Sequence, residues 1–346
     1  MKAHAVTPAA VGAERLVGWV LCHDAHDEGG QLIVRKGTRL DRATAERLAA
    51  AGAGEVHLLE MEPGELHEDP AGERLARAAT APGVRVRDVA GGQWALVAET
   101  RGLLRVAVEA LAGVNALDGI SVYTLFDGQV VDAGDVVAKA KVTPLVIAEA
   151  VVRDAEARAR ARGLVRVRPF LPRPVGAVAL AGLETRARNR FEGVLREKLA
   201  WLGAPLARLA FVEAEPNALA RAIEASIAAG AEIVVAAGAN ALDPLDPMFG
   251  AVERLGGRVV RRGVPAHPGS LLWLARLDAT TILGMPSCGM FSQATLFDLL
   301  LPRLLAGEAL GAPELAAYGH GGLLGREMAF RFPPYRAGQE RGAIPD

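Results

Sequence analysis

Three short apolar runs decide the fold of the second half of the chain. They are VGAVALAG (175–182), ARLAFVE (207–213) and EIVVAAGA (232–239). Helical stretches follow them, at about 189–202, 217–229 and 247–255. Strands that alternate with helices predict βαβ units, and nearly continuous apolar strands are typical of a sheet that is buried on both faces.

Two more runs extend this pattern toward the C-terminus. RVVRRGV (258–264) and TTILGMP (280–286) read as strands, and FSQATLFDLLLPRLLAG (291–307) reads as the last helix. We therefore predict an α/β fold: a three-layer αβα domain over 174–308 with a mostly parallel sheet.

The Pro-rich segment VRVRPFLPRP (165–174) separates this domain from a different pattern upstream. Its prolines favour an extended backbone and mark our preferred boundary. We expect a mixed α+β region, a β-rich module with a connecting helix, the αβα domain and a loosely structured tail, at 1–92, 93–168, 174–308 and 309–346.

Composition excludes several classes of partner. Among 346 residues, 39 Lys and Arg balance 40 Asp and Glu, for a net charge of −1, so we expect neither nucleic acid nor an acidic membrane as partner. Cys22 and Cys288 are too few for a disulfide framework, and neither a secretion signal nor a membrane span is evident. A cytoplasmic protein is expected.

The sequence contains no GxGxxG, GxxxxGK[ST] or GxSxG motif. It therefore indicates neither a standard dinucleotide site, nor a P-loop, nor a nucleophile elbow.

In an open parallel sheet, ligands bind beyond the carboxyl ends of the strands, near helix N-termini that offer free N–H groups. The first such loop contains Glu184, Thr185, Arg186 and Arg188 at the start of a helix. The hydroxyl and the guanidinium groups suit a phosphate, and a solvated helix face is an equal alternative for the arginines.

The second loop, AAGANALDPLDP (236–247), contains Gly238, Ala239, Asn240, Asp243 and Asp246. Glycine permits close approach of the backbone to a ligand, and the two carboxylates suit Mg²⁺ held against phosphates. Helix capping alone would also explain Asp246, and a turn would explain Asp243.

The third loop contains His267, Pro268, Gly269 and Ser270, ahead of a run, LLWLARL (271–277), that we predict to be helical. A lone histidine is more often a surface residue than a base, so the backbone of this loop is the stronger candidate for binding.

The fourth loop contains Gly284, Pro286, Ser287 and Cys288 and leads into the last helix. It can offer hydroxyl and backbone donors to an anion. Cys288 reads either as a thiol with a lowered pKa or as a small buried side chain.

The number and order of these loops resemble the molybdopterin-binding fold of the MogA/MoeA-like proteins of molybdenum cofactor assembly and of gephyrin. In that family a Thr-Gly-Gly loop followed by an Asp contacts the pterin phosphate or an adenylylated intermediate. The matching stretch here is 236–240, followed by Asp243 and Asp246, with Ala in place of Thr and one glycine, Gly238. The family's acidic residue after the second strand matches Glu213 or Glu215.

The N-terminal half resembles a variant found beside this domain in one branch of the family, with motifs such as LHEDPAGERLA (66–76) and VVAKAKVTP (136–144). About 38 residues follow Glu308, too few for the C-terminal β domain of the molybdenum-insertion enzyme.

The resemblance implies a protein that binds molybdopterin, its nucleotide derivative or molybdenum cofactor in biosynthesis, maturation or delivery, with Mg²⁺ and ATP or AMP as further ligands. It also implies a homo-oligomer and a molybdoenzyme client. If the protein is an enzyme, adenylyl transfer or metal insertion is implied. A Mg²⁺-dependent nucleotide pyrophosphatase of the competence-damage type and a noncatalytic interaction module are the alternatives.

Overall fold

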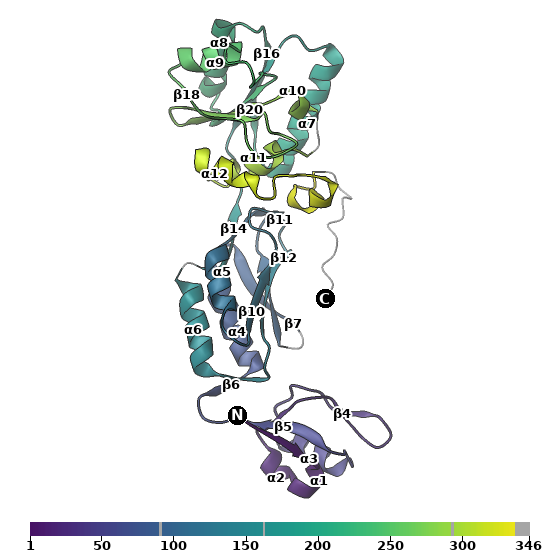
Figure 1. The fold of residues 1–346 in the computed structure, drawn as a ribbon. Helices are drawn as coiled ribbons and strands as arrows, with labels where there is room; N and C mark the ends of the chain where they lie inside the picture. The colour runs from purple at the N-terminus through teal and green to yellow at the C-terminus, as the bar shows by residue number, and fades with distance from the viewer. Residues whose placement is uncertain (90–91, 162, 292–293, 336–346) are drawn as a thin grey trace. The chain divides into compact units, whose positions relative to one another are not determined.

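The computed structural model describes residues 1–89, 92–161, 163–291 and 294–335, apart from a few of their side chains. The chain divides into two units (Figure 1). One comprises residues 1–100, 104–127 and 132–167, and the other comprises 101–103, 128–131 and 168–346.

The second unit contains a six-stranded sheet in the order β16-β15-β17-β20-β19-β18. Its strands are β15 (Val175–Leu180), β16 (Leu206–Val212), β17 (Ile233–Ala237), β18 (Arg258–Arg262), β19 (Trp273–Leu277) and β20 (Thr280–Met285). The first four strands in that order are parallel, whereas β19 pairs antiparallel with both neighbours. This confirms the predicted α/β fold with a mostly parallel sheet.

Four longer helices and several short ones flank this sheet. They are α7 (Thr185–Leu202), α8 (Pro216–Ala228), α9 (Pro247–Arg254), α10 (Ser287–Met290), α11 (Phe297–Leu305) and α12 (Ala312–Ala316), followed by the 3₁₀ turns η1 (Ala317–Gly319) and η2 (Arg326–Arg331).

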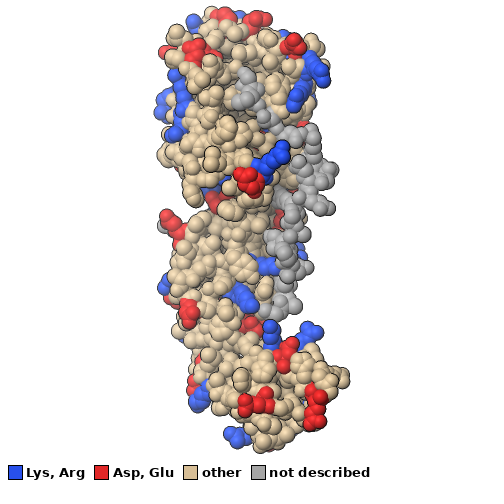
Figure 2. All heavy atoms as spheres, turned by 45° about the vertical axis from the view of Figure 1, so that its right-hand side comes forward, with Lys and Arg blue, Asp and Glu red and all other residues tan. Residues whose placement is uncertain are grey.

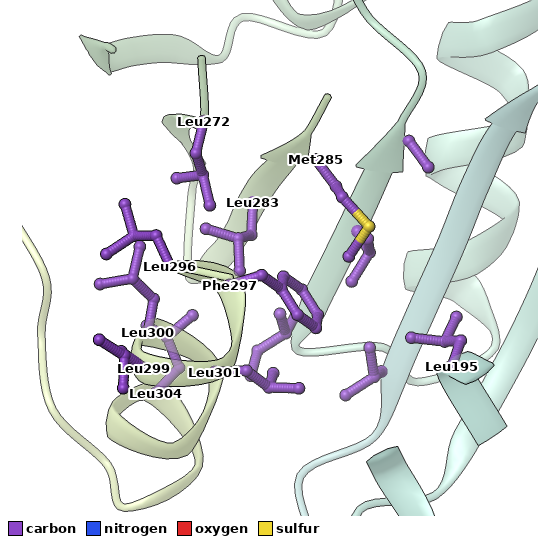
Figure 3. Close-up of a cluster of buried hydrophobic side chains, with 14 of the residues drawn as sticks. Leu195, Leu272, Leu283, Met285, Leu296, Phe297, Leu299, Leu300, Leu301 and Leu304 are labelled. Carbon is purple, nitrogen blue, oxygen red and sulfur yellow. The ribbon is translucent and has the colours of Figure 1, made fainter. Parts of the chain in front are cut away.

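Alternation along the strands assigns the helices to the two faces of the sheet. Val175, Ala177 and Ala179 of β15 pack in one apolar cluster with α7 and α11, whereas Val178 packs in another with α8 and α9. Figure 3 shows part of the first cluster, where Leu195 of α7, Met285 of β20 and Phe297 of α11 converge. Both faces are therefore covered, as a parallel sheet requires.

Two predicted helices differ from the structure. LLWLARL (271–277) forms strand β19 instead of a helix, because it pairs antiparallel with β20 across a tight turn at Asp278, whose φ is +48°. The last long helix begins at Phe297 instead of residue 291, after the short helix α10, and it continues through Pro302.

The first unit contains an N-terminal sheet in the order β1-β5-β2 and an antiparallel sheet in the order β10-β12-β8-β7. The strands up to β8 are β1 (Lys2–Val6), β2 (Val20–Leu21), β3 (Ala25–His26), β4 (Leu32–Val34), β5 (Val56–Glu60), β6 (Glu65–His67), β7 (Val84–Val89) and β8 (Gln93–Ala98). Later strands are β10 (Ile120–Thr124), β12 (Val136–Val142) and β13 (Val146–Ala148). The helices are α1 (Pro8–Val11), α2 (Ala13–Leu16), α3 (Arg42–Ala50), α4 (Glu68–Ala79), α5 (Val108–Asn115) and α6 (Glu149–Arg160).

Three further strands, β9 (Gly102–Val106), β11 (Val130–Val131) and β14 (Val165–Pro169), contain or adjoin the residues at which the chain passes from one unit to the other. Within the described part of the chain, helices with the length and apolar character needed to cross a membrane are absent.

Candidate functional site

Strand register brings the four predicted loops to one edge of the six-stranded sheet. Ala179 of β15 lies opposite Ala237 of β17, which lies opposite Met285 of β20, so these parallel strands end level with one another. Trp273, where β19 begins, lies opposite Arg262, where β18 ends. The loops after β15, β17, β18 and β20 therefore share the carboxyl edge of the sheet.

Hydrogen bonds join some of these segments directly. The N–H of Gly238 in the second loop donates to the carbonyl of Met285, the last residue of β20, at 2.9 Å. The carbonyl of Pro268 in the third loop accepts from the N–H of Leu296, at 3.1 Å. Gly238 has a φ of +93°, in the left-handed region that favours glycine.

In the first loop, the structure separates the two arginines. Arg188 turns back onto its own loop, where Nε donates to the carbonyl of Leu183 at 2.9 Å and a terminal nitrogen donates to the carbonyl of Ala181. Its guanidinium also lies 5.3 Å from the centre of the Phe211 ring. These contacts indicate that Arg188 holds the loop in shape.

Glu184, Thr185 and Arg186 are exposed at the start of α7. Within the described residues, hydrogen bonds and ion pairs do not engage the Arg186 guanidinium. The 18 residues of α7 give this end a full set of unpaired N–H groups and a positive dipole end. Arg186 and Thr185 are therefore the side chains of this loop best placed to meet an anion.

Asp246 braces the second loop from a nearly buried position, with 7% of its surface exposed. Its Oδ1 accepts from the N–H of Met248 at 2.9 Å, which caps α9, and its Oδ2 accepts from the N–H of Asn240 at 2.7 Å. Both carboxylate oxygens thus have backbone partners, which fits the capping interpretation of this residue.

Asp243 and Asn240 remain exposed in the same loop, and Ala239 between strand and loop is buried. One oxygen of Asp243 accepts from the N–H of Leu245 at 2.9 Å, and Oδ1 of Asn240 accepts from the N–H of Leu242 at 3.1 Å. Asp243 is therefore the carboxylate of this loop that is open to a ligand.

Among the described residues, clusters of three or more His, Cys, Asp or Glu able to hold a metal ion are absent. Mg²⁺ does not require such a cluster, since it usually keeps several waters and takes one or two carboxylates together with substrate phosphates. The exposed carboxylate of Asp243 fits a Mg²⁺ that arrives with a phosphate.

The third loop is held by the C-terminal tail, which the sequence did not indicate. The N–H of His267 donates to the carbonyl of Gly322, and its carbonyl accepts from the N–H of Leu324, each at 2.7 Å. The residue itself is exposed, as is Ser270. Gly269 approaches Leu296 so closely that a Cβ there would lie 3.0 Å from the Leu296 nitrogen.

Two residues of the fourth loop have packing roles. Gly284 lies within β20, where a Cβ would overlap the indole of Trp273, and Pro286 is buried at the start of α10. The side chains of Ser287 and Cys288 lie outside the described part of the structure, so their predicted roles stay predictions.

Beside the second loop, α9 and β18 enclose a cavity of about 470 Å³ that our sequence reasoning did not predict. Leu245, 86% exposed, lies at its margin, and the Arg262 guanidinium lies 4.2 Å from the centre of the Phe249 ring.

Glu215, one of the two residues matched to the family's acidic position, caps α8. Hydrogen bonds from the N–H groups of Asn217 and Ala218 lower the pKa of its carboxyl.

Charges of both signs are interspersed over the face drawn in Figure 2, with uncharged surface between them. This distribution agrees with the net charge of −1. An anion site on this chain has to be built locally, from a few cations and helix N–H groups.

Residues 175–306 match the protein family described as "Probable molybdopterin binding domain". This match supports an involvement in molybdenum cofactor biosynthesis. Matches among curated proteins were not found.

Several solved structures are similar to parts of the chain. Molybdenum cofactor biosynthesis protein B is 16% identical, with a TM-score of 0.31, over 39% of this chain and 92% of its own. A molybdopterin biosynthesis moea protein from Pyrococcus horikosii is 14% identical, with a TM-score of 0.30, over 70% and 79% of the two chains. The Mog protein of molybdopterin biosynthesis from Mycobacterium ulcerans is 19% identical, with a TM-score of 0.29, over 38% and 93%.

Proposed function

We propose that this chain, whose residues 175–306 form a domain of the molybdopterin-binding family, binds molybdopterin or a phosphorylated derivative of it at the carboxyl edge of its sheet. The observation that carries the proposal is the shared register of β15, β17 and β20, which puts three loops side by side. The binding serves maturation of the molybdenum cofactor or its delivery to a molybdoenzyme.

The phosphate of the ligand belongs at the start of α7. Unpaired N–H groups of the first turn, the Thr185 hydroxyl and the Arg186 guanidinium supply donors there, and the helix dipole favours negative charge. Arg188 supports this group indirectly, because its hydrogen bonds shape the loop that precedes the helix.

The second loop supplies the remaining polar contacts. Gly238 lets the backbone approach the ligand closely, and the Asn240 side chain is exposed beside it. Asp243 would hold Mg²⁺ that arrives with the phosphate, whereas Asp246 keeps the loop folded. When bound, Mg²⁺ neutralises phosphate charge.

Binding and delivery are favoured over catalysis. The loop that matches the family's Thr-Gly-Gly has Ala237 where the hydroxyl would be, so a donor to a reacting phosphate is missing from that position. Any adenylyl transfer or metal insertion would act through positioning and charge neutralisation.

Isothermal titration of the full chain with molybdopterin, and separately with ATP and Mg²⁺, tests the proposal. Arg186→Ala should weaken binding about tenfold, the loss expected for one charge-assisted contact to phosphate. Asp243→Asn should weaken only the Mg²⁺-dependent part.

Arg196→Ala is the matched control, because Arg196 also lies on α7 but pairs with Glu192. If the unmodified chain binds neither ligand, or both site variants bind as it does, the site is wrongly assigned. Release of a nucleoside monophosphate from a dinucleotide in the presence of Mg²⁺ would favour the pyrophosphatase alternative instead.

A further inference from the structure

A second pocket, of about 450 Å³, lies in the first unit, far along the sequence from the molybdopterin-binding domain. It is lined by residues 35–39 of the N-terminal region, by residues 67–70 at the start of α4, and by Gly92. Its volume falls within the range of about 300–1,000 Å³ that is usual for small-molecule sites.

Glu68 is the unusual residue of this pocket. It is the first residue of α4, it lines the pocket, and only 8% of its surface is exposed. Within the described part of the chain, its carboxylate oxygens accept no hydrogen bond and take part in no ion pair. Burial raises the pKa of its carboxyl.

Two glycines make room for this carboxylate. A Cβ on Gly37 would lie 2.8 Å from Oε1 of Glu68, and a Cβ on Gly92 would overlap Oε2. Both glycines have positive φ values, +77° and +69°. Glycine is therefore favoured at each position by the backbone conformation as well as by the close approach of the Glu68 side chain. The described backbone thus lies close to the carboxylate without donating a hydrogen bond to it, so its oxygens remain available to N–H donors of a ligand in the pocket.

His67 fixes the walls of the pocket to each other. Its Nδ1 accepts from the N–H of Asp69 at 3.2 Å, so the proton of the neutral ring lies on Nε2, which donates to the carbonyl of Gly37 at 2.7 Å. Both ring nitrogens are therefore occupied in positioning the loop at 35–39 against α4.

The rim of the pocket is basic. Arg35, Lys36 and Arg39 line it and are exposed, whereas Asp69 is the second acidic residue of the lining. A ligand that fits this arrangement has an anionic group for the rim and N–H donors for the floor.

We propose that this pocket binds a small phosphate-bearing or carboxylate-bearing molecule with a 2-amino-4-oxo-pyrimidine edge, as in guanine nucleotides and pterins. The ring N–H and the neighbouring amino N–H donate in parallel to the two Glu68 oxygens, and the anionic group contacts Arg35, Lys36 and Arg39. This site is separate from the one proposed at the sheet edge and does not depend on it.

The test is a titration of the full chain with GMP, AMP, inorganic phosphate and pterin-6-carboxylate as probes. AMP has an acceptor where GMP has the ring N–H, so GMP should bind at least tenfold more tightly than AMP. Tighter binding of pterin-6-carboxylate than of GMP would assign the pocket to pterins, and the reverse to nucleotides.

Glu68→Gln should abolish the preference for GMP while AMP binding stays unchanged, because the glutamine amide offers one acceptor instead of two. Arg39→Ala, a change on the exposed rim, should weaken GMP, AMP and phosphate alike. Asp243→Asn in the other unit should leave the preference intact, which separates this site from the sheet edge.

Hydrogen exchange of the unmodified chain locates the probe without relying on any variant. GMP should protect peptides that cover 35–39 and 67–70. Equal binding of GMP and AMP, protection confined to residues 175–306, or an unchanged preference in a folded Glu68→Gln variant would each overturn the proposal.

Discussion

Replacing Lys198 by methionine should loosen the sheet domain on the side of α11. Lys198 Nζ lies 2.6 Å from Oδ1 of Asp298, and the two side chains are 4% and 0% exposed. Oδ1 of Asp298 also accepts from the Tyr335 hydroxyl at 2.9 Å, and its Oδ2 accepts from the N–H of Thr295 at 2.8 Å. The substitution keeps the length of the side chain and removes its charge.

The size of the effect follows from what is left behind. A buried ion pair that loses one partner typically costs about 3–5 kcal/mol, because an uncompensated charge stays buried. Tyr335 and Thr295 still donate to the Asp298 carboxylate in the variant, so we expect the low end, about 3 kcal/mol. That is a factor of about 150 in the local opening equilibrium.

Combining Lys198→Met with Asp298→Asn should recover most of this loss. The asparagine oxygen can accept from the N–H of Thr295, its NH₂ can donate to the hydroxyl oxygen of Tyr335, and it carries no charge, so we expect the double variant to lose about 1 kcal/mol. The loss in the double variant should therefore be clearly smaller than the sum of the losses in the two single variants.

Hydrogen exchange of the peptide that covers α11 (Phe297–Leu305) measures this free energy locally, which matters in a chain of two units that need not unfold together. A loss below about 1 kcal/mol for Lys198→Met, or additive losses in the double variant, would refute the reasoning. Either result would mean that water reaches the pair.

Four further predictions concern the same unit. Gly284→Ala should lower stability by about 1–3 kcal/mol in thermal unfolding, because its Cβ would overlap Trp273. The same change at Gly193, exposed on α7 with open space around it, should raise stability by about 0.5–1 kcal/mol. Asp246→Ala should cost about 1–2 kcal/mol by the same assay, through loss of the cap of α9, and an unchanged melting temperature would contradict that role. Burial and the nearby Asp298 raise the pKa of Tyr335, so the stability it contributes should be intact below about pH 10 and fall as pH rises further, a fall that Tyr335→Phe should remove in urea titrations.

The architecture of the sheet domain was predictable because its strands have a simple signal. Val, Ile and Ala runs bounded by glycine are typical of strands buried on both faces, and β15, β17 and β20 all show it. The strand signal is weaker in LLWLARL, since a short run of seven mostly apolar residues is compatible with a helix as well as with a strand. Asp278, which permits the tight turn into β20, was the available signal for a hairpin.

The arrangement of the four loops was predictable for the same reason, since parallel strands direct their carboxyl ends to one edge. The tail was not. Its backbone bonds to His267 through Gly322 and Leu324 involve no side-chain pattern, and glycine-rich sequence looks the same in a loose tail and in a docked one. The buried Lys198–Asp298 pair was equally hidden, because each residue alone reads as a polar position on a helix.

Residue types also could not separate binding groups from groups that support the loops. Arg186 and Arg188 are equivalent in sequence, as are Asp243 and Asp246, and each pair offers the same chemistry to a phosphate or to Mg²⁺. The path of the backbone decides between them. One member of each pair makes two bonds to main-chain groups of its own loop, Arg188 to two carbonyls and Asp246 to two N–H groups. The other member remains exposed, and among the described residues Asp243 accepts from one N–H only.

This division has a physical consequence for the proposed site. A loop that must hold phosphate with few side chains needs a fixed backbone, because the entropy of ordering it would otherwise reduce affinity. Arg188 and Asp246 provide that order before the ligand arrives. Loss of either should therefore weaken ligand binding through the loop, with a matching loss of hydrogen-exchange protection in the free protein, whereas Arg186→Ala should weaken binding and leave that protection unchanged.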